Sequence, residues 1–140
     1  MIQGINHIAI AVSSMEKVIP FFRDVLKLPF EGTEEVVEQK VRVAFFKVGP
    51  TRIELLEPTS PDSPISKFLE SRGNGLHHIA FETDGILPDL DVLKAQGVRL
   101  IDQAPRHGAH HTQIAFIHPA ASHGVLVELT QPAEKTDGTP

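Results

Sequence analysis

Two histidines and two glutamates stand at matching places in two similar parts of the sequence. His7 and His78 are 71 residues apart, and Glu54 and Glu128 are 74 residues apart. Two matched pairs at nearly one offset indicate an internal duplication. The matched segments are Asn6–Ile10 with His77–Phe81, and Ile53–Pro58 with Val127–Pro132.

These four residue types suit the binding of a metal ion. Imidazole nitrogens and carboxylate oxygens together are typical ligands of divalent Co, Ni, Mn, Fe or Zn. An octahedral ion held by four such groups keeps two positions open for a chelating substrate, which it would polarise. One histidine or glutamate in a strand is usually solvated, but four of them in duplicated register favour a metal site. The predicted ligands are therefore His7, Glu54, His78 and Glu128.

Each half reads as the same order of elements, β-α-β-β-β. Apolar alternation predicts the strands, and longer amphipathic stretches predict the helices. Neither half is long enough to bury its apolar face alone, so we expect one domain over residues 1–132. It comprises module one (about 1–58), a linker (59–75) with a short helical pattern, and module two (76–132), followed by a polar tail (133–140). The expected strands are 5–12, 30–35, 36–48, 51–56, 77–82, 98–102, 113–118 and 124–130. The expected helices are about 16–28, capped by Ser13 or Ser14, and 84–96, closed by Gly97.

Strand alternation places the ligand candidates on one face. His7 shares a face with Ala9, and His78 shares a face with Ala80, opposite the larger apolar residues. If those apolar residues pack against helices, the ligand candidates lie on the other face and converge inside a curved sheet. The predicted fold is α+β, a cupped mixed sheet enclosing a metal site. The same alternation predicts that His77 faces away from His78.

Composition excludes several classes of function. The chain has 140 residues, 13 basic and 18 acidic, with a net charge of −5, so no basic field favours nucleic acid or anionic membranes. There is no signal-peptide pattern and no apolar run of spanning length, so we expect a cytoplasmic location and no membrane partner. There is no cysteine, which leaves histidines, carboxylates, hydroxyls or a metal to do chemistry. Hydrolase, phosphate-loop and zincin signatures are missing from the sequence.

Other polar residues are weaker candidates. The histidines at 107, 110 and 111 fall in a loop that we expect to be solvated, and those at 118 and 123 read as turn residues. Three cations could meet a phosphate or carboxylate, although exposed side chains of this kind usually serve solubility. They are Lys67, Arg72 and Arg106.

The duplicated modules with paired His and Glu resemble the vicinal oxygen chelate superfamily, which includes glyoxalases, bleomycin resistance proteins and dioxygenases. Within it, four stretches taken in order resemble the methylmalonyl-CoA epimerase family. These stretches are Ile53–Pro58, Asp62–Leu69, Gly75–Ala80 and Phe116–Leu129. The resemblance implies a glyoxalase-like fold, a homodimer, an acyl-CoA substrate and a divalent metal, with Co favoured.

The implied activity is metal-dependent interconversion of (2R)- and (2S)-methylmalonyl-CoA by α-proton transfer through a metal-stabilised enolate, with Glu128 as a catalytic base. The strand position where some members carry a second catalytic glutamate holds Val43, which leaves Glu38 or a water on Glu54 as candidates for the second acid or base. The alternatives are glyoxalase I, which uses two His and two Glu, an iron dioxygenase, and a metal-free ligand-binding protein of the bleomycin-resistance type.

Overall fold

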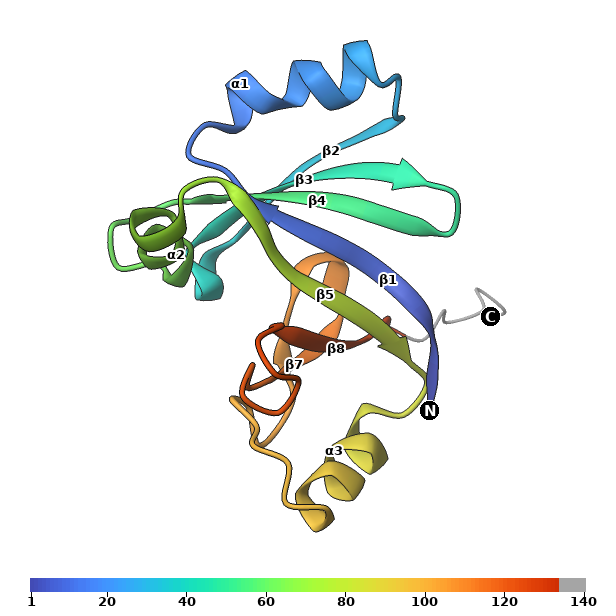
Figure 1. The fold of residues 1–140 in the computed structure, drawn as a ribbon. Helices are drawn as coiled ribbons and strands as arrows, with labels where there is room; N and C mark the ends of the chain where they lie inside the picture. The colour runs from blue at the N-terminus through green and yellow to red at the C-terminus, as the bar shows by residue number, and fades with distance from the viewer. Residues whose placement is uncertain (134–140) are drawn as a thin grey trace.

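A single mixed sheet organises the computed structural model, which describes residues 1–133 (Figure 1). The predicted tail falls, except for its first residue, outside this described part. The eight strands lie in the order β2-β3-β4-β1-β5-β8-β7-β6, and the sheet curls into a cup. They are β1 (Ile2–Ala11), β2 (Phe30–Val36), β3 (Val41–Val48), β4 (Thr51–Pro58), β5 (Gly75–Thr83), β6 (Arg106–His107), β7 (Gln113–Ile117) and β8 (Val127–Gln131).

The strand order has an internal twofold pattern. β1 and β5 pair antiparallel at the centre, and each of them pairs parallel with the last strand of its own half, β4 or β8. The remaining strands continue outward as antiparallel neighbours. The predicted α+β fold, with two β-α-β-β-β units in a cupped mixed sheet, is confirmed.

Helices cover the convex side of each half and one end of the cup (Figure 1). In the first half, α1 (Met15–Pro20) packs through Met15, and the π-helix η1 (Phe21–Val25) through Phe22, on a core that includes Phe46 and Leu55. In the second half, α3 (Ile86–Ala95) packs on its own core through Ile86 and Leu90. The linker helix α2 (Pro64–Arg72) joins a third core inside the cup. None of the helices in residues 1–133 is long and apolar enough to cross a membrane.

The first helical segment is shorter than predicted. Ser14 occupies the N-cap position, but its side chain accepts no cap hydrogen bond. The carboxylate of Glu57 on β4 accepts the Met15 N–H instead, at 2.6 Å. After Pro20, which has no N–H, the chain widens into the π-helix, and it ends before Leu28 because Lys27 takes a left-handed conformation (φ 60°).

Two predicted strands also differ. Residues 36–48 do not form one strand, because a 3-10 turn, η2 (Val37–Gln39), and a left-handed Lys40 (φ 54°) make the bend between β2 and β3. The left-handed position of this bend holds Lys40, where a glycine would have marked a turn in the sequence. The predicted strand 98–102 forms one bridge, from Leu100 to Ile117, because the side chain of Asp102 accepts the Phe116 N–H. Its place in the module is taken by β6.

Candidate metal centre

Two alanines let the four ligand candidates meet. Ala9 on β1 and Ala80 on β5 are fully buried, and each lies directly between one histidine and one glutamate on the neighbouring strands. A methyl group is the smallest side chain that still occupies this face, so the longer side chains on both sides lean over it. The register neighbours are Glu54 and His78 for Ala9, and His7 and Glu128 for Ala80.

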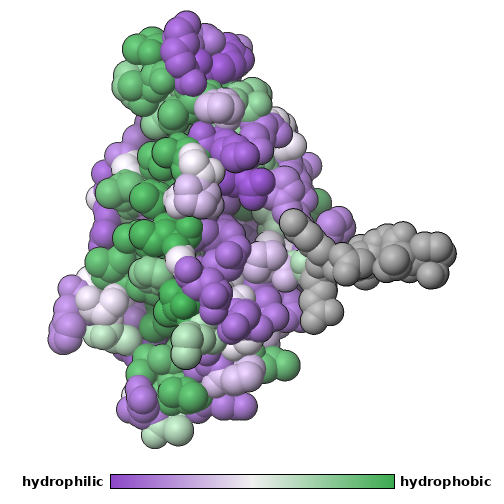
Figure 2. Space-filling view, turned by 90° about the vertical axis from the view of Figure 1, so that its right-hand side faces the viewer, coloured by the Kyte–Doolittle hydropathy of each residue, from purple (hydrophilic) through white to green (hydrophobic). Residues whose placement is uncertain are grey.

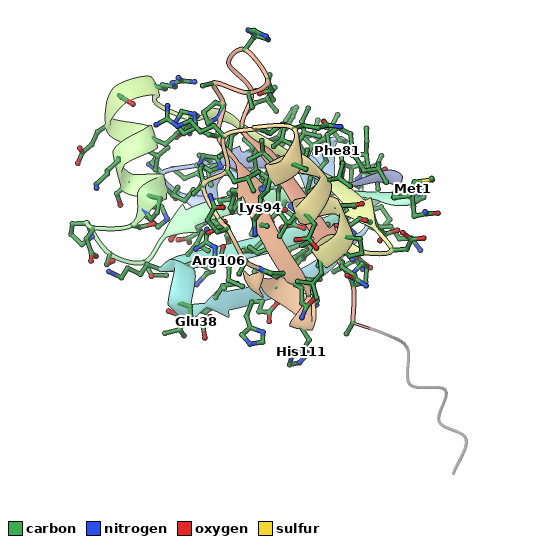
Figure 3. The ribbon with its side chains drawn as sticks, turned by 90° about the horizontal axis from the view of Figure 1, so that it is seen from below. Met1, Glu38, Phe81, Lys94, Arg106 and His111 are labelled. Atoms are coloured by element: carbon green, nitrogen blue, oxygen red, sulfur yellow. The ribbon has the colours of Figure 1, made fainter. Side chains whose placement is uncertain are left out.

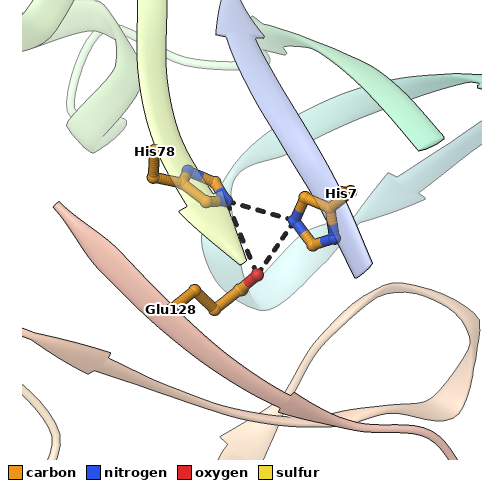
Figure 4. A group of neighbouring side chains, drawn as sticks. All are labelled: His7, His78 and Glu128. Atoms are coloured by element: carbon orange, nitrogen blue, oxygen red, sulfur yellow. Dashed lines mark hydrogen bonds and ion pairs between the residues drawn. The ribbon is translucent and has the colours of Figure 1, made fainter. Parts of the chain in front are cut away.

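Three of the candidates bring their ligand atoms to one point (Figure 4). Nε2 of His7 lies 3.2 Å from Nε2 of His78 and 2.9 Å from Oε2 of Glu128. Nε2 of His78 lies 3.5 Å from the same oxygen. All three side chains are buried, at 4–7% exposure. The three residues come from β1, β5 and β8, so both halves of the chain supply the group.

The chemistry of this group fits a cation better than a set of hydrogen bonds. Oε2 of Glu128 is buried and accepts no hydrogen bond, although it lies within ion-pair distance of both rings. A buried carboxylate oxygen without a donor is costly unless a cation neutralises it. Burial opposes ionisation of this carboxyl, but the imidazoles of His7 and His78 outweigh it and lower its pKa to about 2. A divalent metal is therefore compatible with this donor set.

Glu54 lies on the far side of His7 from the other candidates. Its Oε2 is 3.1 Å from Nδ1 of His7, while the opposite nitrogen of that ring faces His78 and Glu128. Burial raises the pKa of Glu54 to about 7. Burial lowers the pKa of His7, but the carboxylates of Glu128 and Glu54 outweigh this and raise it above the ordinary value. In this arrangement Glu54 contacts a ligand histidine, and three side chains form the centre.

A cavity of about 600 Å³ lies above the group, inside the cup. Its floor is His7, His78 and Glu128, and its apolar wall includes Val43. Polar and charged residues also line it, among them Glu38, Lys40, Arg52, Asp62, Arg106 and His110. Figure 3 shows Glu38 and His111 near one edge of the molecule and Phe81 toward the opposite edge. The volume is in the range of small-molecule sites.

The loop that precedes β7 borders this cavity. It includes η3 (Ala109–His111), and His110 and His111 both have positive φ, 54° and 59°. The ring of His110 lies against that of Phe45 at 4.2 Å between centroids, but His107, His110 and His111 are all exposed, as predicted. His118 and His123 lie in the turn between β7 and β8, as predicted. Of the three weaker cations, Arg106 lines the cup, whereas Lys67 and Arg72 line a second cavity next to α2.

The prediction that His77 faces away from His78 is wrong. Nδ1 of His77 lies 2.8 Å from Nδ1 of His78, and Asn6 makes the equivalent contact with His7, 2.7 Å from Oδ1 to Nδ1. Burial lowers the pKa of His77 to about 4, so the ring is neutral at neutral pH. Strict strand alternation does not allow such a contact, and the register shifts in β1 and β5 explain it. The sequence signal was a polar residue directly before the ligand histidine in both repeats.

Comparison with known proteins finds relatives over nearly the whole chain. Methylmalonyl-CoA epimerase, mitochondrial, of Mus musculus is 39% identical over 128 residues, 91% of this chain and 72% of the mouse protein. Ethylmalonyl-CoA/methylmalonyl-CoA epimerase of Cereibacter sphaeroides is 38% identical over 133 residues, 94% of this chain and 99% of that protein. A structure of a Streptomyces coelicolor methylmalonyl-CoA epimerase variant with 2-nitronate-propionyl-CoA has a TM-score of 0.92 at 36% identity, covering 96% of this chain and 97% of that chain.

The family model for the Glyoxalase/Bleomycin resistance protein/Dioxygenase superfamily matches residues 6–116, which include three of the four ligand candidates and most of the cup. The match, the fold and the relatives agree. The chain belongs to this superfamily.

Proposed function

We propose that this protein is a metal-dependent epimerase that interconverts (2R)- and (2S)-methylmalonyl-CoA. The observation that carries the proposal is the buried group of His7, His78 and Glu128 at the floor of a cavity of about 600 Å³. Similarity over nearly the full chain to proteins named for this activity supports it. One of these relatives is named for ethylmalonyl-CoA as well, so the proposed substrate class is a 2-alkylmalonyl-CoA thioester.

His7, His78 and Glu128 would hold the metal, and Glu54 would be a fourth ligand if its carboxylate turned from Nδ1 of His7 toward the centre. When bound, a divalent ion is a Lewis acid that stabilises negative charge on the thioester and carboxylate oxygens of the substrate. Cobalt is the ion that the family resemblance favours. The two imidazoles supply neutral donors, and the ionised Glu128 offsets one unit of the metal charge.

Epimerisation requires one base and one acid on opposite faces of the same carbon. One carboxylate removes the α-proton, the electron pair enters the thioester carbonyl to give a planar enolate, and a carboxylic acid returns a proton to the other face. We assign the first face to Glu128, at the floor of the cup, and the second to Glu38, in the turn η2. Val43 has no group that exchanges protons, and its side chain is buried in the core that forms this wall of the cavity.

A cation in the cavity lining supports an anionic thioester as substrate. Arg106 lines the cavity, where it would meet the carboxylate or a phosphate of an acyl-CoA, while Lys40, which also lines it, is paired with Asp62. The Arg106 guanidinium also lies over the ring of Phe116, 5.4 Å from its centroid, which holds it at this position.

The test follows exchange of the α-proton with D₂O and the interconversion of epimers, on protein stripped of metal and reloaded with Co²⁺. We expect both reactions to require the metal, and Glu128→Gln to lower them by about 10²–10⁴-fold. If Glu38 serves the second face, Glu38→Gln should still exchange the proton of one pure epimer but should not convert it into the other.

Exchange that is absent with Co²⁺, Ni²⁺, Mn²⁺, Fe²⁺ and Zn²⁺ would contradict the proposal. The same samples would then be assayed with the hemithioacetal of glutathione and methylglyoxal, the substrate of glyoxalase I, and for oxygen uptake on a catechol. Inactivity in all three assays, together with retention of an apolar ligand, would indicate a binding protein.

We also propose that the protein forms a homodimer through the part of its convex side that the helices leave uncovered, on the central strands β1 and β5. Figure 2 shows a band of apolar side chains running the height of the molecule beside hydrophilic surface. Ile5 on β1, Leu76 on β5 and Val125 before β8 are 44%, 70% and 46% exposed, and a second copy would cover them. Sedimentation should give twice the monomer mass, and Leu76→Asp should shift it toward the monomer. A monomeric wild-type protein would contradict this.

A further inference from the structure

The two central strands each carry an extra residue directly before the ligand histidine. In β1, Ile5 pairs with Phe81 and His7 pairs with Ala80, so Asn6 has no partner residue on β5. An extra residue of this kind is a β-bulge, and bulges redirect a side chain from one face of a sheet toward the other.

The second bulge is the counterpart of the first. Ala9 pairs with His78 while the next residue, Ile10, pairs with Leu76, so His77 has no partner on β1. Each repeat therefore places its bulge one residue before its ligand histidine. Regular alternation would place the side chains of neighbouring residues on opposite faces. Because of the bulges, the side chain of Asn6 contacts that of His7, and the side chain of His77 contacts that of His78.

The hydrogen bonds of Asn6 fix the protonation of the His7 ring. The Asn6 amide Nδ2 donates to Oε1 of Glu82 at 3.1 Å, so the amide oxygen must face Nδ1 of His7, 2.7 Å away. The amide oxygen of Asn6 can only accept, which requires Nδ1 to carry the proton. The Nε2 lone pair then faces His78 and Glu128.

The His77 ring is held in place for the same task. It packs edge-on against Phe68 of α2, with 5.0 Å between ring centroids, and against His78 at the same separation. Its Nδ1 lies 2.8 Å from Nδ1 of His78, so one of the two nitrogens donates and the other accepts. If His78 donates, its Nε2 is free to bind a metal, as for His7.

We propose that Asn6 and His77 are positioning residues: each accepts the Nδ1–H of the following histidine, and so directs the Nε2 lone pairs of His7 and His78 toward Glu128. The inference rests on the proposed metal site for its purpose, but the two hydrogen bonds exist without the metal. The duplication has kept the position and the acceptor role while the residue type differs, an amide in one repeat and an imidazole in the other.

The first measurement uses metal-free, ¹⁵N-labelled protein. An N–H···N bond gives a scalar coupling between its two nitrogens, and the proton shows a large one-bond splitting only to the donor. We expect coupling between Nδ1 of His77 and Nδ1 of His78, with the proton on His78. A proton on His77, or no coupling, would overturn the proposal for this pair whether or not the protein binds metal.

The second measurement is Co²⁺ affinity by calorimetry, with the visible absorption of the bound ion as a readout of its geometry. Asn6→Leu and His77→Leu should each weaken Co²⁺ binding by about 10–100-fold and change the spectrum. His77→Asn, which gives the second repeat the residue of the first, should recover most of the lost affinity.

The matched control is Gln3→Leu. Gln3 is also an extra residue of β1, between the paired Ile2 and Gly4, but its amide bonds Met1 and Asp84 and touches no histidine. We expect the Gln3→Leu variant to have the Co²⁺ affinity and the visible spectrum of the wild type. Equal affinity in His77→Leu and Gln3→Leu would overturn the positioning role, whereas a wild type that binds no Co²⁺ but shows the N–N coupling would contradict only the proposed function.

Discussion

Ala9 and Ala80 set how closely the site side chains approach one another. Both are fully buried, and their methyl groups form the part of the floor over which imidazoles and carboxylates lean. Any larger residue would occupy the space through which the neighbouring side chains reach the centre. The requirement for metal binding therefore extends to two residues that have no ligand atom.

Ala80→Val should impair the centre and the fold together. The added carbons push His7 and Glu128 apart and overpack the sheet, at a cost of about 1–3 kcal/mol in the free energy of unfolding. Ala115→Val is the matched control, because Ala115 is equally buried but lies in the core under α3. Denaturant unfolding and Co²⁺ calorimetry should show a stability loss in both variants and an affinity loss only in Ala80→Val. Equal Co²⁺ affinities would contradict this account of the floor.

Asp62 at the rim of the cup gives a pH prediction. The Lys40 ammonium, and then the Ser60 hydroxyl, hold the pKa of this carboxyl at about 2. Because the folded pKa lies below the unfolded value of 3.8, the ion pair stabilises the fold above pH 3.8 and loses this effect as the pH falls toward 2. Lys40→Met should raise the pKa of Asp62 in an NMR titration, and Lys67→Met, on exposed α2, should leave it unchanged. The pair is exposed to solvent, so added salt should also raise this pKa.

The loop over the cup, between β6 and β7, closes tightly at Gly108. Gly108 donates its N–H to the Thr112 carbonyl at 3.0 Å, and a Cβ at this position would lie 2.7 Å from both the Ile114 and the Thr112 side chains. Such contacts are too short for any side chain, so the two ends of the loop meet only through glycine. The loop can close this tightly because Gly108 has no Cβ.

Gly108→Ala should displace the loop and alter substrate binding. We expect a loss of about 1–3 kcal/mol in stability and a higher KM for the acyl-CoA, with the Co²⁺ affinity unchanged because no ligand lies on the loop. Gly75→Ala, where a Cβ meets no heavy atom within 4 Å, is the control. Steady-state kinetics with thermal unfolding would measure both effects, and an unchanged KM would show that the loop does not contact the substrate.

The proposed metal site connects the two halves of the chain. His7 comes from the first half of the chain, and His78 and Glu128 come from the second, across the antiparallel pair of β1 and β5. A ligand that binds only when both halves are folded and in register stabilises the native state against unfolding. The metal would therefore act on stability as well as on chemistry.

Removal of the metal should lower the melting temperature. At a metal concentration of 100 times Kd, binding contributes about 2.7 kcal/mol, which corresponds to about 5–10 °C for a domain of this size. Calorimetric melting with Co²⁺ and with a chelator should show this difference in the wild type. Glu128→Gln should show a much smaller one, and identical melting of the wild type under both conditions would contradict a metal shared by the two halves.

The repeat was the most informative signal in the sequence. Matched His and Glu positions with strand alternation predicted a cupped sheet, the order of elements in each half and a shared face for His7, Glu54, His78 and Glu128. Strict alternation then failed at His77, because a β-bulge leaves no mark on the hydrophobic pattern.

Other differences between the predicted and the observed elements came from single side chains that accept a backbone N–H. Asp102 takes the N–H of Phe116 and so ends a predicted strand, and Glu57 takes the Met15 N–H in place of the serine cap. The turn at Val37–Gln39 was missed because its valine continues the apolar alternation. Long-range contacts of this kind are not encoded in local periodicity.

The four ligand candidates lie on four consecutive strands, β4, β1, β5 and β8. Neighbouring strands are about 4.8 Å apart, so in a flat sheet the outer two backbones would be about 14 Å from each other. The carboxylates of Glu54 and Glu128 approach the same histidine only because the sheet is curled. Metal affinity therefore depends on the curvature of the sheet. A substitution on the convex side or in a helix that flattened the sheet would move the ligands apart without contacting any of the ligand residues.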